Sequence, residues 1–186
     1  MKKRAIFLDR DGVINKEPVE HDYVKNWGEM KILPEAKKAL ALIKQSGYLV
    51  VVITNQRGVA RGLMREEDVH GMHKKLNEKL GGNIDAFYCC FHNVDENCEC
   101  RKPKPGLVRM AAEELKIDVE RSWVVGNSVA DMECGLAAGT KVRLVETNGN
   151  IFQAVKQIVG DGKKGQRGVK STRYGTKSVK ERSPGK

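Results

Sequence analysis

The sequence predicts an α/β fold, a three-layer Rossmann-like parallel sheet with helices on both faces. Four short apolar runs rich in branched residues are typical of buried parallel strands. Stretches with helical periodicity alternate with these runs, and this alternation favours a parallel sheet that is covered on both sides. The four predicted strands lie at residues 5–8, 49–53, 122–125 and 141–145.

Three helices are predicted from caps and from the spacing of apolar residues. Pro34 and Gly47 bracket the first, because proline is favoured near a helix start and glycine just past its end. The other two place apolar residues three or four positions apart. These positions are Val69, Met72, Leu76 and Leu80 in one helix, and Leu107, Ala111 and Leu115 in the other. Ligands of such sheets bind beyond the carboxyl ends of the strands, so polar segments that follow strands are site candidates.

The length of 186 residues suits one folded domain, which we expect at residues 1–160. The connection at residues 15–33 is too short to fold alone, so no large cap domain is expected. Residues 161–186 are rich in Gly, Lys and Arg and poor in apolar residues, which predicts a disordered basic tail. This tail carries most of the net charge of +10. Nucleic-acid binding is therefore not expected, except through the tail.

The longest apolar run, residues 49–53, is far shorter than the roughly 20 residues of a membrane helix. No segment has the pattern of a secretion signal. We therefore expect a cytoplasmic protein with no membrane partner. A monomer is expected.

Two aspartates directly follow the first predicted strand. Asp9 and Asp11 would lie together at the carboxyl edge of the sheet, where like charges need a cation. Mg²⁺ prefers oxygen ligands and commonly shares its coordination with a substrate phosphate. One carboxylate could then attack phosphorus while the other moves a proton. An Asx turn that ends the strand explains the motif alone about equally well.

Polar groups also follow the second strand and precede the third helix. Thr54 and Asn55 offer a hydroxyl and an amide that suit phosphate oxygens. Arg101 and Lys102 could neutralise charge on a phosphoryl group in the transition state. Each motif alone is also consistent with an ordinary polar or basic loop. Their joint position at one sheet edge favours a phosphate site.

Four residues form a compact set of metal ligands. Cys90, His92, Cys98 and Cys100 supply three thiolates and an imidazole, which suit a tetrahedral structural Zn²⁺. A zinc-clamped loop would hold the basic residues that follow it near the phosphate site. Three small buried cysteines beside an incidental histidine are the weaker alternative. The other two cysteines, Cys89 and Cys134, are expected to be structural.

Together, these segments resemble the four motifs of the haloacid dehalogenase-like phosphatases. The motifs lie at residues 9–12, 54–56, 101–103 and 126–131, and their order and spacing match across residues 4–148. Within that superfamily the chain looks most like the heptose-bisphosphate phosphatases and the related histidinol-phosphate phosphatases. Residues 54–62, 90–92 and 98–103 carry this closer resemblance. The resemblance implies a haloacid dehalogenase-like fold.

The resemblance also implies a role for each motif residue. Asp9 would be the nucleophile, Asp11 the general acid and base, and Lys102 the stabiliser of the transferring phosphoryl group. Substrate binding is implied for Thr54, Asn55, Arg101, His21 and Tyr23. The expected substrate is a small phosphorylated sugar, D-glycero-D-manno-heptose 1,7-bisphosphate, which would lose its 7-phosphate. Histidinol phosphate or another small phosphomonoester is the alternative.

One position departs from the pattern of the family. The fourth motif normally has an aspartate after its glycine, and this chain has Asn127. Mg²⁺ would then be held by Asp9, Asp11 and Asn127, and we expect it to bind weakly, because an amide contributes no negative charge. Asp131 could supply that charge directly or through water. A chain that binds phosphorylated ligands or nucleic acid without hydrolysis is the alternative of another class, and the retained catalytic motifs favour an enzyme.

Overall fold

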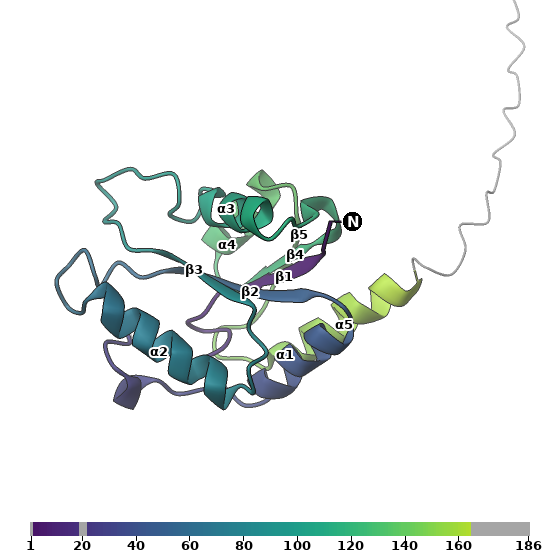
Figure 1. Ribbon diagram of the computed structural model, residues 1–186, viewed down its shortest axis with the longest axis horizontal. Helices are drawn as coiled ribbons and strands as arrows, with labels where there is room; N and C mark the ends of the chain where they lie inside the picture. The colour runs from purple at the N-terminus through teal and green to yellow at the C-terminus, as the bar shows by residue number, and fades with distance from the viewer. Residues whose placement is uncertain (1, 19–21, 165–186) are drawn as a thin grey trace, which may run out of the picture.

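The structure is a computed structural model, and it describes residues 2–18 and 22–164. Five parallel strands form one sheet in the order β3-β2-β1-β4-β5 (Figure 1). The chain first winds to one side of β1 and then to the other. A crevice is expected where that direction changes, beyond the carboxyl ends of β1 and β4. The strands are β1 (Ala5–Leu8), β2 (Leu49–Asn55), β3 (Ala86–Cys90), β4 (Trp123–Gly126) and β5 (Lys141–Leu144).

Helices cover both faces of the sheet in the described part of the chain. Helices α1, α2 and α5 lie on one face, and α3 and α4 lie on the other (Figure 1). Helix α1 ends where Gly47 takes a backbone φ of 76°, a left-handed conformation that favours glycine. The helices are α1 (Ala36–Gln45), α2 (Glu66–Lys79), α3 (Gly106–Glu114), α4 (Val129–Ala137) and α5 (Ile151–Lys164), with 3-10 turns η1 (Trp27–Glu29) and η2 (Val119–Arg121).

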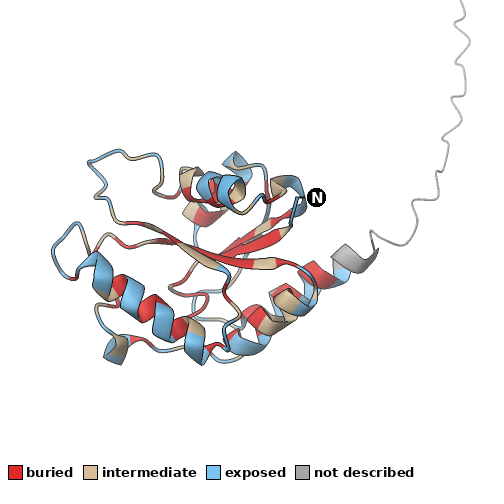
Figure 2. Ribbon diagram, viewed as in Figure 1, coloured by how far each residue is buried: buried red, intermediate tan, exposed pale blue. Residues whose placement is uncertain are grey.

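The core lies in two layers, one on each face of the sheet. Ile6 and Leu8 of β1 pack with the side chains of α1, α2 and α5. Ala5 and Phe7 of the same strand pack against α3 and α4. All four are completely buried, and Figure 2 shows the central strands β1, β2 and β4 buried along most of their length. Burial on both faces explains why β1 reads as a continuous apolar run rather than an alternating one.

The predicted α/β architecture is confirmed. The four predicted strands correspond to β1, β2, β4 and β5, and the three predicted helices correspond to α1, α2 and α3. Strand β3 and helices α4 and α5 were not predicted. Helix α5 continues to Lys164, past the expected end of the domain at residue 160. The rest of the predicted tail, residues 165–186, lies outside the described residues.

The connection between β1 and α1 holds one short 3-10 turn, η1, among its described residues. This segment passes over the carboxyl end of the sheet and contributes side chains to the pocket there. In the described ranges, no helix combines the length and apolar character needed to cross a membrane.

Candidate active site

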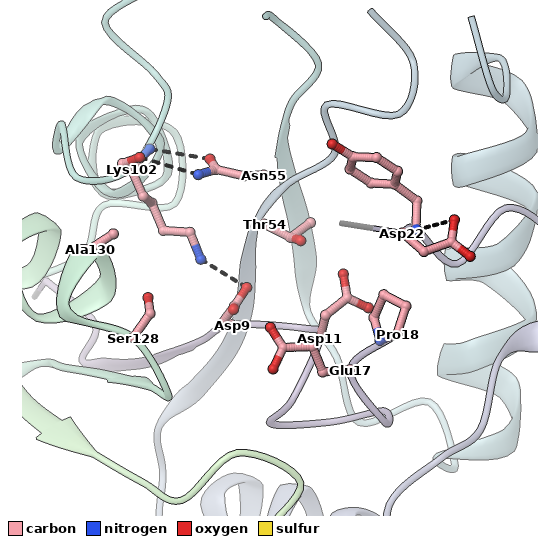
Figure 3. Close-up of a pocket in the computed structure, with 11 residues that line it drawn as sticks. Asp9, Asp11, Glu17, Pro18, Asp22, Thr54, Asn55, Lys102, Ser128 and Ala130 are labelled. Atoms are coloured by element: carbon pink, nitrogen blue, oxygen red, sulfur yellow. Dashed lines mark hydrogen bonds and ion pairs between the residues drawn. The ribbon is translucent and has the colours of Figure 1, made fainter. Parts of the chain in front are cut away.

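A pocket of about 460 Å³ lies at the carboxyl ends of β1, β2 and β4 (Figure 3). Parallel neighbouring strands end at the same edge, so the segments that follow them meet there. The sequence-predicted residues Asp9, Asp11, Thr54, Asn55 and Lys102 all line this pocket, as does Tyr23. The remaining lining residues are Glu17, Pro18, Asp22, Ser128 and Ala130.

Lys102 is a buried cation shared by two carboxylates. Its Nζ atom lies 2.8 Å from Oδ1 of Asp9 and 2.6 Å from Oδ1 of Asp131. It also donates to the carbonyl oxygen of Ile53 on β2, at 3.1 Å. Burial lowers the pKa of Lys102, but the two carboxylates raise it by more, so the net change is upward. The side chain therefore stays charged inside the protein.

Asp131 holds Lys102 from the first turn of α4. Its second carboxylate oxygen accepts from the hydroxyl of Ser128 at 2.6 Å and from the backbone N–H of Ser128 at 3.1 Å. The bond from the N–H of Ser128, with the bond from the backbone N–H of Asp131 to Oγ of Ser128 at 3.3 Å, forms a capping box at the start of α4. A Cβ atom at Gly126 would lie 2.3 Å from Cβ of Asp131, so glycine is required there. Both oxygens of Asp131 are thus engaged by protein groups.

Asp9 directly follows Leu8, the last residue of β1. Its backbone N–H donates to the carbonyl of Val125 at 3.0 Å, and its Oδ1 accepts from the backbone N–H of Arg10 at 2.7 Å. Burial raises the pKa of Asp9 to about 6, because it outweighs the lowering by Lys102 and is reinforced by the charge of Asp131. The site therefore needs more positive charge to keep this carboxylate ionised at lower pH.

Asp11 is surrounded by donors. The Nη2 atom of the fully buried Arg10 lies 2.9 Å from both of its oxygens. The side-chain amides of Asn15 and Gln56 donate to it at 2.8 and 3.0 Å. Burial alone would raise the pKa of Asp11, but Arg10 and these hydrogen bonds lower it below its usual value. The pKa values of the two aspartates in this motif are therefore shifted in opposite directions.

His73 supports Arg10 from helix α2 and was not predicted as a site residue. Nε2 of His73 lies 3.1 Å from Nη1 of Arg10. A guanidinium group only donates, so Nε2 must accept and Nδ1 must carry the proton. Nδ1 faces Sγ of Cys89 at 3.8 Å, and the ring stacks on Phe87 with centroids 4.4 Å apart. Burial, with the charge of Arg10, lowers the pKa of His73 to about 3, so the ring is neutral.

Thr54 and Asn55 at the end of β2 have different tasks. The hydroxyl of the buried Thr54 accepts from Gln56 at 2.8 Å, which leaves its own proton free for a ligand in the pocket. The side-chain amide of Asn55 donates to the carbonyl oxygen of Lys102, and its oxygen accepts from the N–H of Lys102, both at 3.2 Å (Figure 3). Asn55 thereby fixes the backbone that carries Lys102.

The other predicted site residues lie in different positions. Arg101 and Asn127 are not among the residues that line the pocket. Nδ2 of Asn127 lies 3.1 Å from Oγ1 of Thr147 and 3.4 Å from Oε2 of Glu17. Its Oδ1 atom is buried without a hydrogen-bond partner among the described residues. His21 lies outside the described residues.

The cysteine and histidine set comes together as predicted from its spacing. The four ligand atoms of Cys90, His92, Cys98 and Cys100 lie within 4.8 Å of one another. The Sγ atom of Cys98 is 3.6 Å from that of Cys90 and 3.5 Å from that of Cys100. Thiolates around a tetrahedral zinc ion are separated by about 3.8 Å, given zinc–sulfur bonds of about 2.3 Å. The set could therefore hold a metal ion.

Comparisons with known proteins find similar sequences over most of the chain. A family model described as haloacid dehalogenase-like hydrolase matches residues 3–139. The D-glycero-beta-D-manno-heptose-1,7-bisphosphate 7-phosphatase of Pseudomonas aeruginosa is 38% identical over 150 residues, covering 79% of this chain and 83% of that protein. The Pasteurella multocida protein of the same name is 37% identical over 171 residues, covering 87% and 88%.

A solved structure is similar over most of the chain. It is the D,D-heptose 1,7-bisphosphate phosphatase from B. bronchiseptica, complexed with magnesium and phosphate. The TM-score is 0.73 at 36% identity, and the match covers 83% of this chain and 86% of that one. The fold is therefore common to both proteins.

Replacement of His73 tests its support of Arg10. His73→Leu leaves an N–H of Arg10 buried and unsatisfied, so we expect the free energy of unfolding to fall by about 1–3 kcal/mol. His73→Gln offers an acceptor oxygen and should retain more of that free energy. Urea unfolding of both variants measures the difference. Equal loss in the two variants would mean that packing against Phe87, rather than the hydrogen bond, is what His73 contributes.

Proposed function

Because this chain belongs to the haloacid dehalogenase-like hydrolases, we propose that it is a magnesium-dependent phosphomonoesterase with an aspartyl-phosphate intermediate at Asp9. The observation that carries this proposal is the pairing of Asp9 with the buried Lys102 in a pocket that Thr54 also lines. A nucleophile, a cation and a hydroxyl donor thus surround one space. A phosphoryl group is the ligand that would use all three.

The proposed substrate is D-glycero-D-manno-heptose 1,7-bisphosphate, which would lose its 7-phosphate. The names of the relatives from Pseudomonas aeruginosa and Pasteurella multocida support this choice. The extent of the pocket also supports this substrate, because its lining reaches from Asp9 to Asp22 and Tyr23 on the connection between β1 and α1. Residues on this connection could contact the sugar, since the described residues form no separate cap domain.

In the proposed first step, a carboxylate oxygen of Asp9 attacks phosphorus and the bond from phosphorus to the sugar oxygen breaks. Lys102 would offset negative charge on the phosphoryl oxygens, and Thr54 would donate a hydrogen bond to one of them. Asp11 would protonate the departing alcohol. In the second step, water attacks the phosphorus of the acyl phosphate and gives a proton to Asp11, which releases phosphate and restores Asp9.

The residues around the pocket fit a divalent cation. Asp9, Asp11 and Asn127 would hold Mg²⁺, whose charge would favour the ionised carboxylates and the bound phosphate. The Oδ1 atom of Asn127 has no hydrogen-bond partner among the described residues, and the raised pKa of Asp9 indicates that Lys102, which Asp131 shares, does not offset the burial of that carboxylate. Asp131 fits this set poorly, because its side chain is 1% exposed, against 21% for Asp11, and Lys102 and Ser128 contact both of its oxygens.

We also propose a structural Zn²⁺ at Cys90, His92, Cys98 and Cys100. The loop that carries these ligands packs closely on the start of α3, where a Cβ atom at Gly106 would lie 2.3 Å from the carbonyl oxygen of Glu99. Lys102 follows this loop directly. A cross-link here would reduce the entropy lost when Lys102 is held in place.

Replacement of the nucleophile tests the reaction. Asp9→Asn should lower phosphate release from heptose 1,7-bisphosphate by at least about 1,000-fold in saturating Mg²⁺, because an amide does not form the acyl phosphate. Asp95→Asn, at an exposed residue on the cysteine loop, is the matched control. Comparing kcat/KM for the heptose bisphosphate and for histidinol phosphate tests the substrate. Turnover by Asp9→Asn close to that of the unaltered protein would refute the mechanism.

The ionisation of Asp9 gives a second test. Its raised pKa means that, without metal, the carboxylate takes up a proton as the pH falls through about 6 rather than near 4. A bound cation favours the ionised form, so saturating Mg²⁺ should move this midpoint to lower pH. Carboxyl NMR of protein labelled in aspartate, assigned with Asp9→Asn, measures both midpoints. A midpoint that Mg²⁺ does not change would argue against a cation beside Asp9.

The zinc proposal is tested by Cys98→Ser. This variant should lose bound zinc and have a lower Tm, because the free energy of zinc binding stabilises the folded state. Cys89→Ser is the control, since Cys89 lies outside the ligand set and should leave the zinc content unchanged. Zinc is measured by mass spectrometry of the purified proteins. A full complement of zinc in Cys98→Ser would exclude Cys98 as a ligand.

A further inference from the structure

The pocket contains one acidic side chain for which the described part of the chain offers no cation. Four carboxylates line the pocket, and three of them have a basic partner. The exception is Glu17. The ion pairs are Asp9–Lys102, Asp11–Arg10 and Asp22–Lys25, with N–O distances of 2.8, 2.9 and 2.8 Å.

The charges around the pocket do not balance. The ammonium group of Lys102 forms ion pairs with both Asp9 and Asp131, so two carboxylates share one cation. With Asp11, Arg10 and Glu17 included, the group has four carboxylates and two cations, which leaves a net charge of −2. One divalent cation neutralises that charge. A phosphate ester, itself an anion, would be repelled without it.

Glu17 is held close to the pocket by backbone contacts. Its N–H donates to the side-chain oxygen of Asn148 at 2.7 Å. The N–H of Asn148 in turn donates to the carbonyl oxygen of Gly12 at 2.8 Å, directly after the Asp9–Asp11 segment. These two bonds link the segment after β5 to the segment after β1. Glu17 is therefore at a defined place beside the aspartates, although its side chain is exposed.

The carboxylate of Glu17 lies next to the neutral residue of the proposed metal set. Its Oε2 atom is 3.4 Å from Nδ2 of Asn127, a long contact that contributes little as a hydrogen bond.

We propose that Glu17 is a ligand of the divalent cation and supplies the negative charge that Asn127 does not. This inference rests on the proposed function, because it concerns the metal of the same pocket. Glu17 could bind the cation directly or through a coordinated water molecule, as carboxylates at magnesium sites do. In either case, the connection between β1 and α1 would contribute to metal binding as well as to substrate binding.

Metal binding without substrate tests the proposal. We would titrate the full-length, zinc-loaded protein with Mn²⁺, a paramagnetic substitute for Mg²⁺, and measure free Mn²⁺ by electron paramagnetic resonance. Glu17→Gln should weaken binding about 10- to 100-fold, the usual effect of removing a carboxylate close to a bound metal. Glu113→Gln, an exposed residue on α3, removes the same charge far from the pocket and should leave the Kd within about twofold.

The variant Asn127→Asp distinguishes a shared role from an independent one. An aspartate at position 127 would supply charge at the same place, so it should tighten Mn²⁺ binding and reduce the effect of Glu17→Gln. The double variant Glu17→Gln, Asn127→Asp should therefore bind Mn²⁺ more tightly than Glu17→Gln alone. A Kd for Glu17→Gln within twofold of the unaltered protein would overturn the proposal.

Phosphate release, measured separately, keeps this outcome distinct from the failure of the proposed function. If the unaltered protein binds Mn²⁺ through Glu17 but hydrolyses no sugar phosphate, the ligand assignment stands and the proposed reaction is wrong. If hydrolysis requires Mg²⁺ and Glu17→Gln has the same Mg²⁺ dependence, the reaction stands and the ligand assignment is wrong. As a control, metal-free Glu17→Gln should have the same Tm as the unaltered protein. A lower Tm together with weaker Mn²⁺ binding would assign Glu17 a structural role instead.

Discussion

The buried ammonium group of Lys102 is the contact on which the rest of the site depends. Its partners are Asp9 after β1, the Ile53 carbonyl on β2 and Asp131 on α4, so one charge joins three elements. Removing one partner from a buried ion pair typically costs about 3–5 kcal/mol, because the other charge is left without compensation. The packing of α4 on the sheet and the position of the nucleophile are thus fixed by the same group that would meet a phosphoryl group.

Much of the fold could be predicted because both faces of the sheet are covered. Strand β1 was predicted with the bounds that the structure has, since complete burial gives an uninterrupted apolar run. Strand β3 at the sheet edge is only partly buried, and its apolar run contains no Val, Ile or Leu, so it lacks the branched residues that indicated the other strands. Helix α4 packs through Gly135, where a Cβ atom would lie 2.6 Å from Val142, rather than through large apolar residues. Helix α5 was missed although Ile151, Val155 and Ile158 have helical spacing.

The candidate site was predictable where a residue directly follows a strand, and less so elsewhere. Asp9 and Thr54 come together because β1 and β2 are neighbours in a parallel sheet. His73 gave a weak signal, a polar residue within the apolar stripe of α2, but its partner Arg10 is 63 residues away. Glu17 gave none, because its position depends on how the connection after β1 folds and on a hydrogen bond to Asn148, 131 residues away. Contacts of this kind are set by tertiary structure alone.

The opposite environments of Asp9 and Asp11 fit the two roles that the reaction needs. Asp9 shares its cation with Asp131, so burial dominates and its pKa rises to about 6. Arg10 and the side-chain amides of Asn15 and Gln56 all donate to Asp11, and together they lower its pKa. The lowered pKa suits a base that accepts a proton from water. A phosphate group in the pocket would raise the pKa of Asp11, because a nearby negative charge disfavours the carboxylate. Once Asp11 has given its proton to the departing alcohol, it is the carboxylate that accepts a proton from water in the second step.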